Sequence, residues 1–162
     1  MTNLILMFLH LTAAAIGVGS LVYAVFLFLP AMDKIPESLQ PGQEERSPQY
    51  RALDILGPTV FACVLVLIGT GTYYLLENYT EQAGLKPGYY NLFGVKMLFV
   101  IGSFFLSLYI AFPLRQRIAN LDLSPENRVH VPVTLARIRS IARLLLGLIL
   151  MAVFCGIWLV RY

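Results

Sequence analysis

Two ionisable residues, His10 and Lys96, lie inside long apolar stretches of the sequence and are the first candidates for chemistry. A lysine in the hydrocarbon layer of a membrane costs about 3 kcal/mol on insertion scales, so it is rarely without a function. A neutral imidazole is a common metal ligand and an axial ligand of haem iron. The two residue types together indicate a site for a metal, a haem or an anion inside a membrane.

Each of these residues also has a purely structural interpretation. His10 can hydrogen-bond to a neighbouring helix, and the long stem of Lys96 can carry its ammonium to the outer headgroups. In the functional interpretation, His10 is a ligand or a proton-transfer group. Lys96 then holds an anionic or polar oxygen, such as that of a propionate, a quinone or a lipid phosphate.

The composition predicts the elements that position these residues. Of the 162 residues, 58% are hydrophobic and 13% are charged, whereas soluble domains are about 25% charged. Four apolar stretches, at about 4–30, 55–76, 92–114 and 138–160, each meet the length of roughly 20 residues that a membrane helix needs. We therefore expect an all-α integral membrane four-helix bundle, with residues 1–162 as a single transmembrane domain.

The basic residues predict the orientation of the helices. Arginine and lysine concentrate in the segments 31–54 and 115–137, between the first and second and between the third and fourth stretches. By the positive-inside rule these two loops face the cytoplasm, so both termini lie outside, in a bacterial inner membrane. Topology thus explains the net charge of +3, and we expect no nucleic-acid partner.

His10 and Lys96 are predicted to lie at similar depths in this topology. Both helices enter the membrane from outside, with His10 about six and Lys96 about four residues past the start. At 1.5 Å per residue, these positions correspond to depths of roughly 9 and 6 Å. The two side chains are therefore expected in one layer of the outer leaflet.

Two further groups of residues are candidates for binding a cofactor. Ala13, Ala14 and Gly17 follow His10 on the same helix face, where small residues allow close helix packing or leave room for a bulky ligand. Arg139 and Arg143 share a face at the cytoplasmic start of the fourth helix. They suit either lipid headgroups or an anion site for a propionate.

Two segments of the sequence resemble a known bacterial group. The first segment, 8–23, contains His10 followed by small residues and an aromatic residue. The second, 93–98, contains Lys96 among aliphatic residues. These segments resemble the copper-resistance D-type membrane proteins and the HemJ-type protoporphyrinogen oxidases. HemJ-type proteins are small four-helix membrane proteins that bind b-type haem. The resemblance implies functional, catalytic roles for His10 and Lys96.

The first functional hypothesis is a b-type haem protein of the membrane, acting in electron transfer or in porphyrin-linked oxidation as an oxidoreductase. His10 would be the metal ligand, and Lys96 either the opposite ligand or the partner of a propionate. A second hypothesis is copper transport along Met7, His10 and Met97, which are soft or borderline ligands. A third is a small non-catalytic subunit. Expected partners are membrane lipid and either a second copy of the chain or a larger membrane redox complex.

Overall fold

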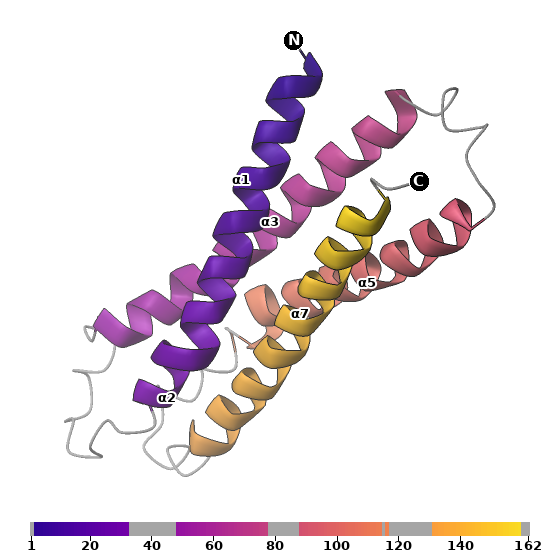
Figure 1. Ribbon diagram of the computed structural model, residues 1–162. Helices are drawn as coiled ribbons and strands as arrows, with labels where there is room; N and C mark the ends of the chain where they lie inside the picture. The colour runs from indigo at the N-terminus through magenta and orange to yellow at the C-terminus, as the bar shows by residue number, and fades with distance from the viewer. Residues whose placement is uncertain (1, 33–47, 78–87, 115, 117–130, 160–162) are drawn as a thin grey trace.

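The computed structural model describes residues 2–32, 48–77, 88–114, 116 and 131–159, and all of them except the turn at Gly88 are helical. Consecutive long helices run in opposite directions along the bundle (Figure 1). Their bounds are α1 at Thr2–Tyr23, continued by η1 at Ala24–Phe28 and α2 at Leu29–Met32; α3 at Pro48–Glu77; α5 at Tyr89–Tyr109, continued by η3 at Ile110–Leu114; and α7 at Val131–Leu159. The predicted all-α four-helix bundle is confirmed.

Four spans in these helices are long and apolar enough to cross a membrane: Leu4–Ala31, Asp54–Glu77, Tyr89–Leu114 and Val133–Leu159. Each is at least 24 residues long, which exceeds the roughly 20 that the hydrocarbon layer requires. Length and composition therefore support a multi-pass membrane protein whose outer surface contacts lipid.

The helices begin earlier than the apolar stretches predict. α3 begins at Pro48, not near residue 55, and α7 begins at Val131, not near residue 138. Apolarity marks where a chain enters the hydrocarbon layer, whereas a helix continues into polar surroundings because it satisfies its own backbone hydrogen bonds. The sequence criterion thus finds the spans and misses their polar extensions.

Two of the helices widen into π-helical turns near a proline. η1 is followed closely by Pro30, and η3 contains Pro113. Proline has no backbone N–H and its ring clashes with the preceding turn, and a π-turn is one way for a helix to absorb this. Both π segments lie toward the same end of the bundle, opposite the end at which α1 begins (Figure 1).

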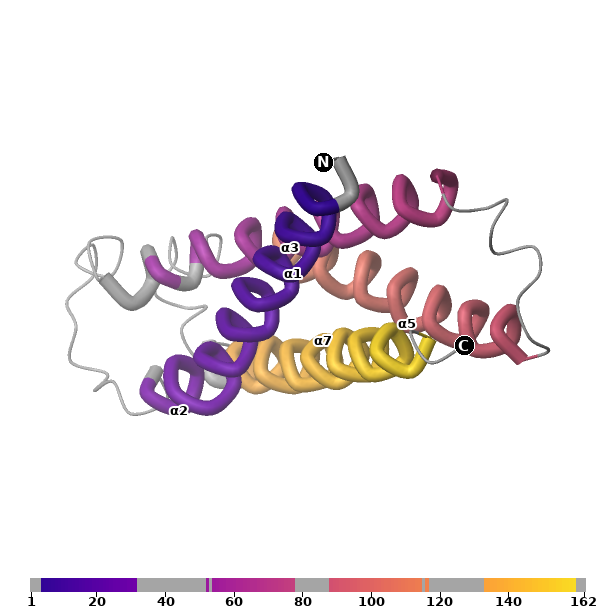
Figure 2. The backbone as a smooth tube through the Cα atoms, turned by 45° about the horizontal axis from the view of Figure 1, so that its top comes forward, coloured from indigo at the N-terminus to yellow at the C-terminus, as the bar shows by residue number. Residues whose placement is uncertain are grey.

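The helices pack in the cyclic order α1, α3, α5, α7, so α1 and α5 lie diagonally across the bundle. We call the end at which α1 and α5 begin the amino end. The hydrophobic core occupies the opposite half, where the late part of α1 meets the early parts of α3 and α7 (Figure 2). Its buried members are Leu21, Val25, Phe28, Leu29, Val60, Val64, Leu114, Leu135, Ile138, Ala142, Leu145, Leu146 and Ile149.

Gly17 permits the close approach of α1 to α3. A Cβ atom at this position would lie 3.2 Å from the Cβ of Cys63, which is tighter than most real contacts between such atoms. Small residues at membrane helix interfaces allow this separation, and dispersion contacts between the helices then stabilise the pair. Gly19, by contrast, has nothing within 4 Å of the position of its missing Cβ.

Gly17→Leu should destabilise the protein by about 1–3 kcal/mol, because an added side chain forces α1 away from α3. Gly19→Leu adds the same volume on an open face and should change stability by no more than about 0.5 kcal/mol. The thermal unfolding midpoint in detergent, followed by circular dichroism, compares the two variants. Equal midpoints would contradict the assigned role of Gly17.

Candidate functional site

His10 is tied to α3 by a hydrogen bond across the helix pair. Its Nδ1 lies 2.7 Å from the Oγ1 of Thr70, in the part of the bundle that precedes the core along α1. The imidazole is half-buried, since its helix face packs beside α3. Nδ1 of His10 therefore makes the hydrogen bond to a neighbouring helix that the structural interpretation predicts.

The environment of Thr70 favours one direction for this hydrogen bond. The Thr70 hydroxyl has the carbonyl of Val66 as its acceptor at 2.6 Å, with the carbonyl of Leu67 at 3.3 Å as a weaker alternative. With its single hydrogen used there, Oγ1 can only accept from His10, and on this basis we assign the ring hydrogen to Nδ1. In the neutral imidazole this leaves the lone pair on Nε2, which is the arrangement found in metal-ligating histidines.

Gly71, the residue after Thr70, lies beside the His10 ring. A Cβ atom at Gly71 would lie 3.7 Å from Cε1, the ring carbon between the two nitrogens. This is ordinary van der Waals contact, so alanine would fit, and α3 borders the ring directly at this residue.

Lys96 lies within electrostatic range of His10, across the diagonal of the bundle. Its half-buried side chain crosses from α5 to α7, where Nζ would be 3.4 Å from a Cβ added at Gly156. Cys155, the neighbour of Gly156, is buried and is a free thiol. Among the residues that the structure describes, Lys96 makes no hydrogen bond or ion pair.

The other predicted site residues lie apart from this pair. On α1, Ala13 and Gly17 are buried, and Ala14 is half-buried. The space expected at Gly17 is filled by Cys63 of α3. Met7, the first residue of the suggested copper path, is 64% exposed on the outer face of α1.

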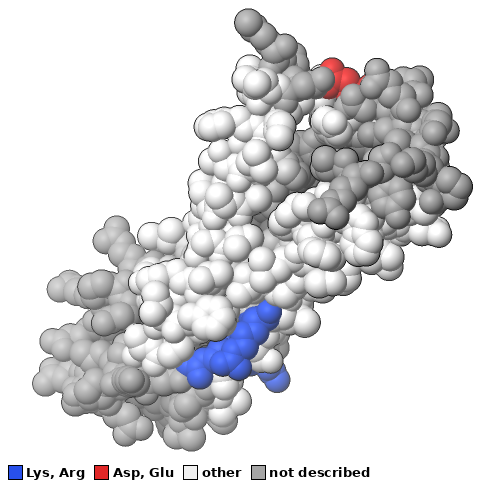
Figure 3. All heavy atoms as spheres, in the orientation of Figure 1, with Lys and Arg blue, Asp and Glu red and all other residues white. Residues whose placement is uncertain are grey.

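Arg139 and Arg143 belong to a separate polar group at the opposite end of the bundle. One Nη atom of Arg139 donates to the carbonyl of Leu29 at 3.0 Å, which ties α7 to the end of the first helix. Arg143 is exposed, and the cluster of blue atoms in Figure 3 marks this end. About 20 Å of helix separates Arg143 from Gly156. One porphyrin cannot place its iron at His10 and its propionates at these arginines.

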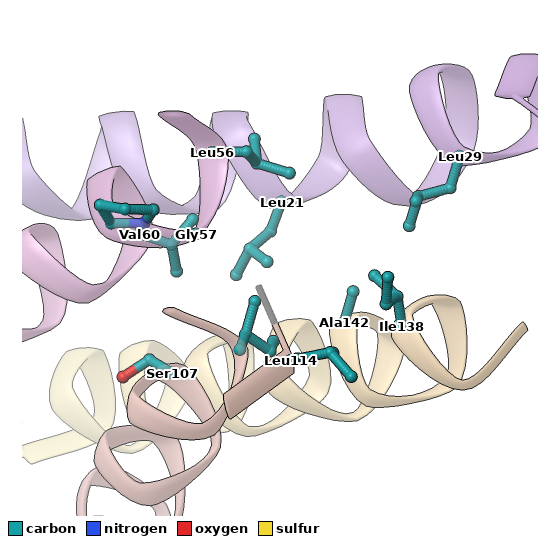
Figure 4. A pocket seen from close by; sticks show the side chains of 11 residues that line it. Leu21, Leu29, Leu56, Gly57, Val60, Ser107, Leu114, Ile138 and Ala142 are labelled. Atoms are coloured by element: carbon teal, nitrogen blue, oxygen red, sulfur yellow. The ribbon is translucent and has the colours of Figure 1, made fainter. Parts of the chain in front are cut away.

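A small cavity also lies in the core half, away from His10 (Figure 4). It is almost entirely apolar, with the Ser107 hydroxyl turned to the carbonyl of Phe104 at 2.9 Å. Its volume of about 30 Å³ corresponds to room for a water or two, not for a cofactor. The cavity lies where Gly57 and Pro58 of α3 face η3, the π-helical continuation of α5.

The site also includes residues that the sequence interpretation did not single out for function, namely Thr70, Gly71 and Gly156. Thr70 and Gly71 stand in a run of small residues at 69–72, which by itself indicates only close helix packing. A threonine at the depth of a membrane histidine was the available signal. Nothing in the sequence points to Gly156, because its contact with Lys96 depends on the length and direction of the Lys96 side chain.

Comparison with known proteins places the chain beside none of them: no family model, curated protein or solved structure matches it. Within the described residues, no group of three or more His, Cys, Asp or Glu side chains could hold a metal ion. The chemistry of the candidate site therefore has to be argued from His10, Thr70 and Lys96 themselves.

The assigned tautomer of His10 can be measured directly. In ¹⁵N-histidine-labelled protein at a pH where the ring is neutral, the two nitrogen shifts should report hydrogen on Nδ1. Thr70→Val removes the acceptor and should move the shifts toward the mixture seen in free imidazole, whereas Thr72→Val, on an exposed position of the same helix, should leave them unchanged. Hydrogen on Nε2 in the unaltered protein would contradict the assignment.

Proposed function

We propose that this protein is a membrane b-type haem protein in which His10 Nε2 is an axial ligand of the iron. The observation that supports this most directly is the His10–Thr70 hydrogen bond. It leaves Nε2 with a free electron pair for a metal, on a ring whose Nδ1 is already hydrogen-bonded to Thr70. A hydrogen bond of this kind orients ligating histidines and raises their basicity.

The residues around His10 have distinct tasks in this proposal. Thr70 holds the imidazole in one orientation, and Gly71 lets α3 lie beside the ring. Lys96, within electrostatic range of the ring, would either ligate the iron as a neutral amine or, as an ammonium, pair with a propionate. The haem, when bound, would supply one-electron transfer. The resulting activity is electron transfer or porphyrin-linked oxidation in the outer half of a bacterial inner membrane.

The diagonal arrangement of α1 and α5 bears on where the group would bind. His10 and Lys96 come from these two helices, so a group bound between them would occupy the interior of the bundle near the amino end. The core cluster lies mainly in the other half, and the buried residues toward this end, such as Ala13, Ala152 and Cys155, are small. A larger redox complex or a second copy of the chain would deliver or accept the electrons.

The absorption spectrum of detergent-purified protein after haem reconstitution tests the proposal. We expect a Soret band that shifts on reduction, and its loss in His10→Ala with helical circular dichroism unchanged. His130→Ala removes the only other histidine, in the predicted cytoplasmic loop at 115–137, and should keep the band. An unaltered protein that binds no haem, or a His10→Ala variant that binds it equally well, would refute the assignment.

Thr70→Val should weaken haem binding roughly 10–100-fold, the usual cost of losing the residue that orients a ligating histidine. Thr70→Ser keeps the hydroxyl and should restore most of the affinity. Haem titration followed at the Soret band gives both dissociation constants. Equal affinities of the valine and serine variants would show that Thr70 acts only through packing.

A further inference from the structure

The four long helices form two closely packed pairs. α1 packs most extensively against α3, and α5 packs most extensively against α7, whereas fewer contacts join one pair to the other. Glycine brings the helices together in both: a Cβ added at Gly17 would lie 3.2 Å from Cys63 of α3, and one added at Gly102 would lie 3.2 Å from Leu148 of α7. We call α1 with α3 the first pair and α5 with α7 the second pair.

The two pairs are joined firmly at the core end. The buried apolar cluster takes its members from both pairs. Arg139 of the second pair donates a hydrogen bond to the carbonyl of Leu29, which continues the first helix, at 3.0 Å. Gly57 of α3 lies against the backbone of η3, since a Cβ at this position would be 3.4 Å from the Cα of Ala111. Apolar burial, a hydrogen bond and close helix contact therefore all connect the pairs in this half.

The pairs are packed loosely against each other at the amino end. Among the described residues, the last buried residue of α3 is Val64 and the first buried residue of α5 is Ser103. Both views of the backbone show the amino-end halves of α3 and α5 diverging (Figures 1 and 2). Gly69 and Gly94, one on each helix, have nothing within 4 Å of a missing Cβ. Because packing contacts hold membrane helices together, this half does little to fix the separation of the pairs.

The two ionisable residues each contact a helix of their own pair. His10 of α1 is hydrogen-bonded to Thr70 of α3, and the Lys96 side chain of α5 lies against Gly156 of α7. Neither contact ties one pair to the other. The two side chains nevertheless lie within electrostatic range across the loosely packed interface. A change in the separation of the pairs would therefore change the distance between them while each keeps its own support.

We propose that the two helix pairs pivot about the core end as rigid units, so that the amino end opens and closes between His10 and Lys96. Closure of packed units about a hinge is a common conformational change in proteins. The helix from Val64 to Leu76 is about 18 Å long, so a rotation of about 10° displaces the amino end by about 3 Å. Closure on a bound haem rests on the proposed function, whereas the movement of the empty protein does not.

Distances between two spin labels on the full-length protein in lipid nanodiscs test this movement. Labels at Leu76→Cys and Asn91→Cys, exposed on α3 and α5, span the pairs at the amino end. Labels at Ile55→Cys and Phe112→Cys, also exposed, span the pairs at the core end. Phe8→Cys with Leu76→Cys lies within the first pair. All three variants are made in a background whose two native cysteines are alanine, with helical circular dichroism as the check of folding.

Without haem, displacement grows with distance from the pivot. We therefore expect the amino-end distribution to be about 3 Å broader than the distribution within the first pair, and the core-end distribution to be broader by no more than about 1 Å. Equal widths at the two ends would overturn the pivot. A distribution within the first pair as broad as that between the pairs would show that single helices move, not rigid pairs.

Addition of haem tests closure on the same labelled samples, with the Soret band as an independent measure of binding. We expect the mean amino-end distance to shorten by about 3 Å and the core-end distance to change by no more than about 1 Å. A Soret band with an unchanged amino-end distribution would refute closure and leave the haem proposal intact. If no Soret band forms, the haem proposal fails, and the widths measured without haem still decide whether the pairs move.

Discussion

The lack of water in a bilayer is the constraint from which this architecture follows. A backbone N–H or C=O in the hydrocarbon layer has to find its partner within the chain, and a helix satisfies nearly all of them locally. Apolar side chains then cover the four spans. Pro30 and Pro113 remove a backbone donor in or beside a π-helical turn, whereas α3 accommodates Pro58 without one, and all three helices remain helical. The few polar side chains that enter the spans stand out because the rest of the chain obeys this constraint so closely.

The two halves of the bundle differ in how they are packed. At the core end, α1, α3 and α7 bury a continuous apolar cluster that holds the helices together, and Arg139 adds a bond to the carbonyl of Leu29. At the amino end, the helices are held by fewer apolar contacts and carry His10, Thr70 and Lys96. Because the core half supplies apolar packing, the amino end can hold polar side chains that would otherwise destabilise the fold.

The sequence predicts the spans well, because membrane insertion depends on length and apolarity, which are sums over many residues. It also identifies His10 and Lys96, since ionisable residues are rare in such segments. It could not predict that Thr70 would meet His10 or that Gly156 would support Lys96. Those contacts depend on the rotation of each helix about its own axis, which the packing of small residues such as Gly17 decides. All four helices are only weakly amphipathic, so the sequence does not show which face of each helix points into the bundle.

The contacts of His10 and Lys96 at the amino end leave different groups without a hydrogen-bond partner, so the two residues suit different ligands. Thr70 satisfies one nitrogen of His10 and leaves the other with a lone pair, which attracts an electron-pair acceptor such as a metal ion or a proton. Gly156 supports the stem of Lys96 and leaves an ammonium, which attracts an anionic oxygen. The proposed haem would meet both demands, because its iron accepts an electron pair and its propionates pair with a positive charge.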